Sequence, residues 1–507
     1  MSKPTTLTQL LAVGQDDAVA ISAPATPDLS YRALRAQVAA TLKDLQSAGL
    51  TPDDRVAIVL PNGPEMAVAF LAVAAAVTSA PLNPSYRADE FDFYLTDLKA
   101  KALIVEAGST SPAIEVAKKL GVPIVTLNPT PQAGAGSFTL DMAGLSLGGA
   151  ARAATPDDIA LVLHTSGTTS RPKIVPLSQR NVCASAYNIA QTLSLTAKDR
   201  GLNVMPLFHI HGLIAAVSAP LSVGGSVFCT PGFNALKFFA WMDEAHPTWY
   251  TAVPTMHQAI VGRAKNNAAI IAANPLRFVR SSSSSLPPQV LHEVEATFDA
   301  PVVEAYGMTE AAHQMACNPL DRSARKPGTV GLPAGPEVAI MGDDGALLEV
   351  GGIGEIVIRG DNVTAGYENN PKANAEAFTN GWFRTGDQGS KDSDGFITIT
   401  GRLKEIINRG GEKISPREVD EILMDHPAVL QVVTFGIPHD KLGEEVGAVV
   451  VLREGANASE RDLRDYVGTR AAPFKVPSKV LFMDEIPKGA TGKLQRIGLA
   501  QKLGLGS

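Results

Sequence analysis

Apolar residues in the first part of the chain gather into short runs that are typical of buried strands. These runs, rich in β-branched residues, recur at 55–60, 102–105, 122–125, 226–229 and 249–253. The Ala-rich stretch from Met66 to Val77 is longer, and it predicts a buried helix shortly after the first run. Strands that alternate with helices in this way are typical of a parallel sheet covered by helices.

From about Gly328 the pattern changes to short strands and Gly-rich turns, as in GEIVIRG at 354–360. Beyond Gly401, mixed strand and helix signals fill a segment of about a hundred residues, enough for a domain of its own. The fold class is therefore expected to be α/β and α+β. We expect a large N-terminal domain of parallel α/β sheets at 1–401, whose small β-rich subdomain covers about 328–401, and a small mobile C-terminal α+β domain at 402–507.

Composition narrows the kinds of partner. A chain of 507 residues is long enough for two or more domains. Its formal net charge of -7 argues against a broad basic surface for nucleic acid, so we expect small-molecule partners. The three cysteines, Cys183, Cys229 and Cys317, show no CxxC spacing, which argues against a disulfide framework and a thiolate zinc site.

No sequence feature predicts a membrane span or an address signal. The stretch from Met66 to Val77 is about a dozen residues long, short of the ~20 that a spanning helix needs. The first residues contain no long apolar run with a cleavage site, and the final GLGS is not a retention or peroxisomal signal. We therefore expect a cytoplasmic protein. The oligomeric state is left open.

A hydroxyl-rich loop, HTSGTTSRPK at 164–173, directly follows the apolar run 159–163. Hydroxyls and backbone N–H groups can donate to phosphate oxygens, and Lys173 adds positive charge. The pattern GxxxxGK[ST] is absent, which argues against a P-loop kinase or NTPase. Such a loop is in general more often a solvated turn, but here the whole string is specific. The expected phosphate-binding residues are Thr165, Ser166, Gly167, Thr168, Thr169 and Lys173.

The loop resembles the signature of the adenylate-forming superfamily of acyl-CoA synthetases, luciferases and peptide-synthetase adenylation domains. Matching motifs follow in the same order over nearly the whole chain. The resemblance implies that the protein uses ATP and CoA as co-substrates and Mg²⁺ as a cofactor. Two positions depart from the family: Ser170 and Ile174 stand where glycine is common. If these positions require a positive φ, Ile174 would be strained.

The segment EAYGMTE at 304–310 resembles the part of the family that holds adenine, the α-phosphate and the metal. The resemblance implies that the Tyr306 ring stacks on adenine, that Thr309 meets the α-phosphate and that Glu310 binds Mg²⁺. A π-face, a hydroxyl and a hard carboxylate oxygen suit these tasks. Taken alone, Tyr306 would more often be a core aromatic residue. The nucleotide-binding residues expected here are Ser283, Ser284, Glu304, Ala305, Tyr306, Gly307 and Thr309.

Four later motifs complete the resemblance. In GWFRTGD at 381–387 it implies that Asp387 accepts the ribose hydroxyls, and in GRLKEII at 401–407 that Arg402 contacts ribose or phosphate and Lys404 is the hinge. In NRGGEKISP at 408–416 it implies that Gly410 and Gly411 line the CoA tunnel. In PKGATGKLQR at 487–496 it implies that Lys493 bridges the acid and the α-phosphate. Without the motif, Lys493 would be an ordinary solvated lysine.

The strings at 164–173, 206–213, 248–255 and 280–286 narrow the resemblance to the plant and fungal oxalyl-CoA synthetases. A pocket for a fatty or aryl acid should be mainly apolar, whereas this chain has five serines at 281–285 and EAAH at 310–313. Hydroxyls and imidazoles suit a small dianion, because a second carboxylate buried without donors is costly. The expected pocket residues are His209, Ser282 and His313. Each also has a structural alternative, and His211 could merely pack.

The expected reaction is therefore acid activation as an acyl-AMP, followed by transfer to CoA. His209, Thr309, Glu310 and Lys493 are the expected catalytic residues, with Glu310 as the metal ligand. Oxalate is the favoured acid. Malonate, a short-chain acid and an aryl acid are alternatives, and so is a stand-alone carrier-loading adenylation enzyme. A luciferase-like oxygenase and a non-enzymatic nucleotide sensor fit less well.

Overall fold

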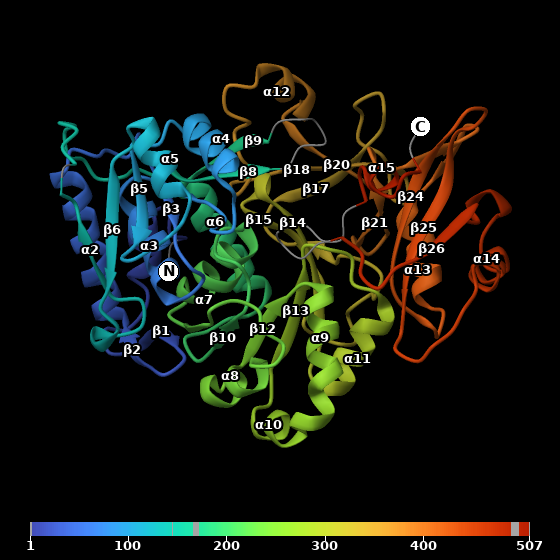
Figure 1. Cartoon of the computed structure of the whole chain (residues 1–507), viewed down its shortest axis with the longest axis horizontal. Helices are drawn as coiled ribbons and strands as arrows, with labels where there is room; N and C mark the ends of the chain where they lie inside the picture. Colours follow the sequence, from blue (N-terminus) through green and yellow to red (C-terminus); the bar gives the residue numbers. More distant parts are fainter. Residues whose placement is uncertain (1–2, 144, 166–171, 488–495, 506–507) are drawn as a thin grey trace.

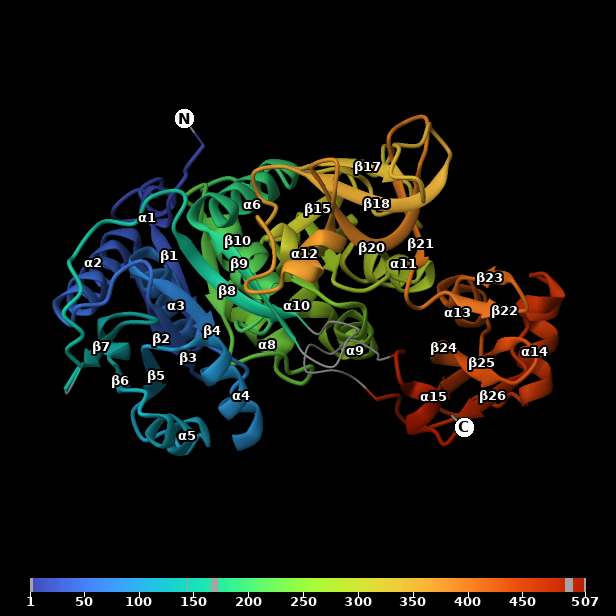
Figure 2. The same cartoon turned by 90° about the horizontal axis from the view of Figure 1, so that it is seen from above.

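The computed structural model describes residues 3–143, 145–165, 172–487 and 496–505, and these ranges form four β-sheets. In Figure 1 the chain passes from a blue sheet at one side, through a green and yellow sheet in the middle, to an orange-red C-terminal unit at the other side. Figure 2 shows the C-terminal unit standing beside the N-terminal sheets as a separate body.

The first sheet, as far as the chain is described, has seven strands in the order β7-β6-β5-β3-β4-β8-β9. These are β3 (Arg55–Val59), β4 (Thr78–Pro81), β5 (Ala102–Glu106), β6 (Ile124–Pro129), β7 (Phe138–Asp141), β8 (Ile159–Thr165) and β9 (Lys173–Ser178). The five inner strands are parallel, whereas β7 and β9 are antiparallel edges. Since β8 and β9 pair directly, Thr165 and Lys173 face each other at the two ends of the predicted phosphate loop.

The second sheet has nine strands within the described ranges, in the order β16-β15-β14-β13-β12-β10-β11-β1-β2. These are β1 (Val19–Ala23), β2 (Thr26–Ser30), β10 (Arg200–Asn203), β11 (Ser226–Cys229), β12 (Trp249–Ala252), β13 (Phe278–Ser282), β14 (Val302–Met308), β15 (His313–Cys317) and β16 (Leu332–Pro333). Its inner strands from β14 to β1 are parallel, so the carboxyl ends of β12 and β13 meet at one edge. That edge carries the serine run and the motif at 304–310.

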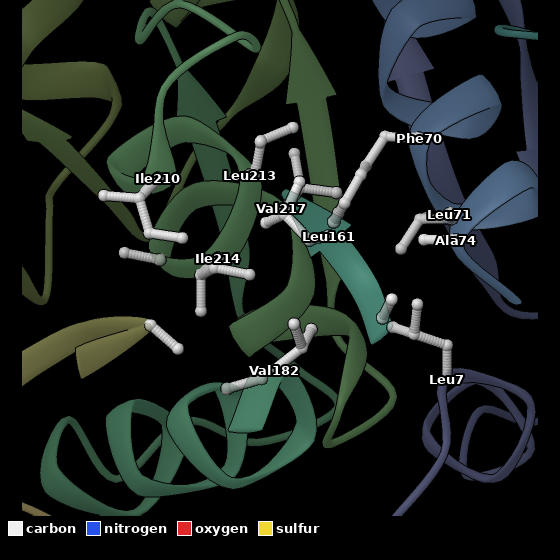
Figure 3. Close-up of a cluster of buried hydrophobic side chains, with 14 of the residues drawn as sticks. Leu7, Phe70, Leu71, Ala74, Leu161, Val182, Ile210, Leu213, Ile214 and Val217 are labelled. Atoms are coloured by element: carbon white, nitrogen blue, oxygen red, sulfur yellow. The ribbon is translucent and has the colours of Figure 1, made fainter. Parts of the chain in front are cut away.

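Helices pack between and around these two sheets. They are α1 (Leu7–Leu11), α2 (Tyr31–Ser47), α3 (Pro64–Ala76), α4 (Ala88–Leu98), α5 (Ala113–Leu120), α6 (Gln179–Thr192), α7 (Ala219–Leu221), α8 (Phe238–Ala245), α9 (Pro254–Ala264), α10 (Ala268–Ala273) and α11 (Pro288–Phe298), with the π-helix η2 (His211–Ser218) and the 3₁₀ turns η1 (Pro131–Ala133), η3 (Lys265–Asn267) and η4 (Thr309–Ala311). The predicted Ala-rich helix is α3, which is buried on every side from Met66 onwards. Figure 3 shows Phe70 and Leu71 of α3 in one core with Leu161 of β8 and Leu213 of η2.

The remaining two sheets are smaller. An antiparallel sheet contains β17 (Glu337–Met341), β18 (Ile353–Arg359), β19 (Phe378–Thr379), β20 (Trp382–Lys391) and β21 (Ile397–Arg402), beside α12 (Pro371–Ala377). The C-terminal sheet contains β22 (Ile407–Arg409), β23 (Glu412–Ile414), β24 (Val429–His439), β25 (Gly443–Leu452) and β26 (Lys479–Phe482), with α13 (Pro416–Met424), α14 (Glu460–Gly468), η5 (Pro473–Lys475) and α15 (Leu499–Lys502). The chain passes between the two sheets at 402–407, beside the predicted boundary at Gly401.

The expected fold class is confirmed: parallel α/β sheets, a β-rich subdomain and a small C-terminal α+β unit are all present. The role of 401–402 as the boundary of two independently moving domains stays a prediction. Across the described ranges, every helix is too short or too polar to cross a membrane.

Candidate active site

The phosphate loop leaves β8 at Thr165 and returns at Lys173, and Ser166, Gly167, Thr168 and Thr169 lie outside the described residues. Ile174 pairs with His164 in the β8–β9 ladder and is buried. It does not occur among the residues with a positive φ. The strain that the departure from glycine would imply is therefore not present, because the structure has ordinary extended backbone at this position.

Lys173 is linked to the predicted metal ligand through a tyrosine that the sequence analysis missed. The Lys173 Nζ atom lies 4.0 Å from the centre of the Tyr367 ring, and the Tyr367 hydroxyl donates to Glu310 Oε1 at 2.8 Å. The backbone N–H of Glu368 donates to the carbonyl of Ile174 at 3.1 Å, which holds this segment against β9. A tyrosine in a Gly-Tyr pair gives no chemical signal by itself, so only the fold reveals this link.

Glu310 lies in the η4 turn after β14 and is only 6% exposed. Burial raises the pKa of its carboxyl, while the Tyr367 hydrogen bond and the charges of Lys173 and Arg402 oppose that rise. No group of three or more His, Cys, Asp and Glu that could hold a metal occurs among the described residues. A single carboxylate fits Mg²⁺, which commonly takes one or two carboxylates and completes its shell with phosphates and water.

Three of the predicted nucleotide residues form one cluster. The Tyr306 hydroxyl donates to the Asp387 carboxylate, and Arg402 Nε lies 3.0 Å from Asp387 Oδ1. Burial and the Asp387 charge raise the pKa of Tyr306 well above its ordinary value, so the phenol keeps its proton. The Asp387 carboxylate in turn raises the pKa of Arg402. The cluster joins β14, β20 and β21, and Asp387 pairs directly with Arg402 in the ladder.

Asp387 reaches this cluster because β20 bulges at the preceding residues. Val357 of β18 pairs with Arg384, but Glu355, two residues away, pairs with Gln388, so β20 contains extra residues here. Gly386 within the bulge has a φ of 74° and donates its N–H to Glu355 Oε1 at 2.8 Å. Residues 382–387 of this motif therefore lie in a bulged strand, whereas an isolated Thr-Gly-Asp would more often be a turn.

A histidine pair lies beside the serine run. His211, at the start of η2, contacts Ser283 Oγ through Nδ1 at 3.0 Å and Thr251 Oγ1 through Nε2 at 2.7 Å. Its ring stacks on His313, with 4.9 Å between ring centres and 21° between the planes. His211 therefore does more than pack. The neighbouring Ile210 and Leu213 point into the apolar core (Figure 3).

The serines of the run differ in their contacts. Ser282 is fully buried and donates to the carbonyl of Ala305 at 2.8 Å, whereas Ser284 is exposed. Ser283 is half-buried and is the serine that contacts His211. The hydroxyl of Ser282, an expected pocket residue, is therefore already used between β13 and β14. The roles of all three serines stay predictions.

His209 and Glu304 are held by backbone groups. The backbone N–H of His211 donates to His209 Nδ1 at 3.2 Å, so a neutral His209 carries its proton on Nε2. Glu304 is buried, and its Oε1 accepts from the Leu286 N–H at 3.1 Å. Burial raises the pKa of Glu304 to about 7, although the charge of Arg417 on α13 lowers it in part.

Residues with a positive φ gather near the carboxyl ends of β13 and β14. Ser283, Ala312 and His313 have φ values of 75°, 46° and 106° although none is glycine. A Cβ atom added to Gly307 would lie 1.9 Å from the His313 carbonyl oxygen, so only glycine fits there. Strained conformations of this kind persist where surrounding structure holds them, and they concentrate at functional sites.

The two glycine candidates of the C-terminal unit lie in a turn of its own sheet. Gly410 and Gly411 form the two-residue turn between β22 and β23, with φ values of 61° and 96° that suit glycine. In Figure 2 the β22–β23 hairpin lies well apart from β15. Lys404 is exposed between the two sheets. Lys493 lies outside the described residues, but Arg496 forms ion pairs with Glu405 at 3.1 Å and Asp420 at 2.7 Å.

Comparison with known proteins covers nearly the whole chain. Residues 10–368 match the AMP-binding enzymes, and residues 418–493 match their C-terminal domain. An oxalate–CoA ligase from Arabidopsis thaliana is 46% identical over 90% of both chains. An oxalate–CoA ligase from Saccharomyces cerevisiae is 44% identical over 88% of this chain and 86% of the relative.

The solved structures agree with these matches. ATP-bound MatB from Rhodopseudomonas palustris is 30% identical and gives a TM-score of 0.87 over 98% of both chains. The apo form of the same protein gives a TM-score of 0.78. The structure of this chain is therefore more similar to the ATP-bound form than to the apo form. With family matches in both parts of the chain and close relatives over most of its length, the protein belongs to the AMP-binding enzymes, the adenylate-forming family that its motifs resemble.

Proposed function

We propose that the protein is an ATP- and CoA-dependent ligase that converts oxalate, ATP and CoA to oxalyl-CoA, AMP and pyrophosphate through an oxalyl-AMP intermediate. The activity class is supported by the family and by the two oxalate–CoA ligases among its relatives. The choice of acid is carried by one observation, the hydrogen-bonded pair of His211 and Ser283 stacked on His313. An apolar acid would leave the Ser283 hydroxyl without an acceptor, which costs affinity.

In the first half-reaction a carboxylate oxygen attacks the α-phosphorus of ATP and pyrophosphate leaves. Tyr306, Asp387 and Arg402 hold adenine and ribose, and the residues from Thr165 to Lys173 hold the leaving phosphates. Thr309 and Lys493 donate to the α-phosphate as charge builds on it. Bound at Glu310, Mg²⁺ would neutralise phosphate charge. The chain's own contribution is mainly position and fixed charge.

In the second half-reaction the CoA sulfur attacks the acyl carbonyl and AMP leaves. The C-terminal domain turns about Lys404, so that Lys493 withdraws and Gly410 and Gly411 approach the CoA arm. Beside the hydrogen bond that the Ser415 hydroxyl donates to the Thr400 carbonyl next to the hinge, two polar contacts between the units are long. Gln258 Nε2 lies 3.5 Å from the Leu430 carbonyl, and Arg453 lies 4.0 Å from Glu293. Contacts at these distances are weak and can separate at low cost.

Two other candidates share the same residues. A ligase for malonate or a short monocarboxylate would use the same donors, and an aryl acid fits less well because it needs apolar walls. A stand-alone carrier-loading enzyme would share only the first half-reaction.

Initial rates of CoA-thioester formation with oxalate, malonate, acetate, octanoate and 4-coumarate test the acid. We expect oxalate to give the highest kcat/KM, and a rate at background with oxalate would defeat the proposed substrate. AMP release with and without CoA tests the class, because only a CoA ligase needs CoA for turnover.

A further inference from the structure

Arg280 is a buried cation at the centre of the second sheet. It lies on β13, and its side chain is among the largest fully buried ones, with 0% exposure. Among the ion pairs of the described residues, none includes Arg280. A guanidinium so deeply buried is normally paired with a carboxylate, because an unpaired buried charge is costly.

None of the described groups that hydrogen-bond to Arg280 is a carboxylate. Its Nη2 donates to Gln314 Oε1 at 3.2 Å, and its Nη1 lies 3.4 Å from His211 Nε2 and 3.5 Å from Thr251 Oγ1. Within the described parts of the chain, its Nε finds no acceptor. Cys317 is near, but burial raises the pKa of that thiol to about 11, so it is neutral. Burial lowers the pKa of Arg280 to about 10, so the side chain still carries its charge at neutral pH.

Arg280 sets the direction of a chain of hydrogen bonds that ends at Ser283, which was expected at the nucleotide and directly follows the expected pocket residue Ser282. A guanidinium can only donate, so Thr251 Oγ1 and His211 Nε2 are acceptors toward it. Thr251 therefore directs its own hydrogen to His211 Nε2, at 2.7 Å. A neutral His211 then carries its proton on Nδ1 and donates it to Ser283 Oγ at 3.0 Å.

The last member of this chain is Ser283. Since its oxygen already accepts from His211, its hydroxyl hydrogen is left to donate elsewhere. Ser283 is half-buried and is held with a positive φ of 75° at the end of β13, which aims it away from the regular ladder. A hydroxyl in this state suits an acceptor-only partner such as a carboxylate.

We propose that Arg280 is a positioning residue that selects a small dianionic acid: its charge attracts the carboxylate farther from the reacting one, and its donor-only character makes Ser283 a donor to that carboxylate. Arg280 itself does not touch the acid. This inference rests on the proposed function, because it names how the acid pocket recognises the second carboxylate. It also accounts for a buried charge that has no carboxylate partner among the described residues.

Arg280→Met removes the charge and the donors but keeps an unbranched, though shorter, side chain, and Arg280→Lys keeps both the charge and the donor-only character. We expect Arg280→Met to raise the KM for oxalate by roughly 10- to 100-fold, the range for losing a hydrogen bond to a charged group. The KM for ATP should change by less than about threefold, because the hydrogen bond and the ion pair that join Tyr306, Asp387 and Arg402 are not part of this chain of hydrogen bonds. Arg280→Lys should recover most of the affinity for oxalate.

Thermal unfolding without ligands separates this role from a structural one. A buried cation without a counter-ion does not stabilise the free protein, so the melting temperature of Arg280→Met should equal or exceed that of the wild type. A normal KM for oxalate in Arg280→Met would overturn the inference, and so would an Arg280→Lys variant as impaired as Arg280→Met. A lower melting temperature with equal losses for oxalate and ATP would show a structural role instead.

Measurements on the wild type distinguish a failure of this inference from a failure of the proposed function. If the wild type makes no oxalyl-CoA, the proposed substrate and the role of Arg280 fail together. If the wild type is active and Arg280→Met keeps its KM for oxalate, only the role of Arg280 fails.

Discussion

Tyr367 connects two residues far apart in the sequence, Lys173 and Glu310, through its ring and its hydroxyl. The hydrogen bond favours the ionised form of Glu310, against the burial that raises its pKa. An ionised Glu310 is what a bound Mg²⁺ requires. The activity should therefore decline as the pH falls through the pKa of Glu310, and Tyr367 should set where that happens.

Tyr367→Phe removes only the hydroxyl and keeps the ring against Lys173. The pKa of Glu310 should rise further, so the acidic limb of the profile of ATP–pyrophosphate exchange against pH should move to higher pH. The loss at pH 7 should be about tenfold, the lower end of the range for one hydrogen bond to a charged group. Tyr466→Phe is a matched control, because that hydroxyl bonds the Asp425 carbonyl in the C-terminal unit. Superimposable profiles for Tyr367→Phe and the wild type would contradict this role.

The role of Lys493 is assigned from its motif alone. The two half-reactions of the proposed enzyme can be measured separately, which tests this role. Lys493→Ala should lower acyl-AMP formation by about 100-fold or more, the usual effect of removing one fixed group that stabilises transition-state charge. Thioester formation from supplied acyl-AMP should stay within about threefold of the wild type, since the residue has withdrawn by then. Unchanged adenylation would remove Lys493 from the mechanism.

At the scale of elements, α3 stabilises the N-terminal body because it is buried on all sides. It contacts β1, β4, β8 and β11, and so joins the two large sheets. An amphipathic helix could not do this, because it would present polar residues to one of the sheets. The Ala-rich sequence allows the close approach on both faces, and Phe70 and Leu71 fill the remaining space (Figure 3).

Phe70→Ala should therefore cost about 3–5 kcal/mol of stability, through lost burial and the cavity that remains. Thermal unfolding followed by circular dichroism measures the effect as a lower melting temperature. Leu236→Ala is the matched control, because Leu236 is 73% exposed and should change stability by less than about 0.5 kcal/mol. Equal effects of both substitutions would contradict the assignment of α3 to the core.

The hinge belongs to the scale of the whole molecule, where two bodies share one reaction. Lys404 lies between β21 and β22, which belong to different sheets. Two anchors flank it. Arg402 is paired with Asp387 in the N-terminal part, and Glu405 is paired with Arg496 in the C-terminal unit. A rotation therefore has few residues over which to change φ and ψ.

Lys404→Pro should restrict that change because the proline ring holds φ near -65°. Single-turnover thioester formation from acyl-AMP should slow by about tenfold or more, whereas ATP–pyrophosphate exchange should change by less than about threefold. Lys404→Ala controls for the lost side chain and should leave both steps near the wild type. A Lys404→Pro variant with both half-reactions intact would argue against a pivot at this residue.

Local patterns predicted much of the architecture. Runs of β-branched residues are short and bounded by turns, so the strands at 55–60, 102–105 and 226–229 could be recognised without tertiary contacts. The motifs likewise identified Tyr306, Asp387 and Arg402, which the fold brings into one cluster. The bulge that carries Asp387 was not predictable, because it depends on the register between β18 and β20.

The sequence by itself determined the family, the order of the elements and most of the residues near the nucleotide, since these depend on short motifs and local periodicity. Only the tertiary structure decided which residues support them. Tyr367 gains its partners from β9 and the η4 turn. Arg280 becomes a buried charge with no carboxylate partner in the described part of the chain because of the strands on both sides of it. Burial and the absence of a counter-ion are properties of surroundings, and distant parts of the chain supply those surroundings only after folding.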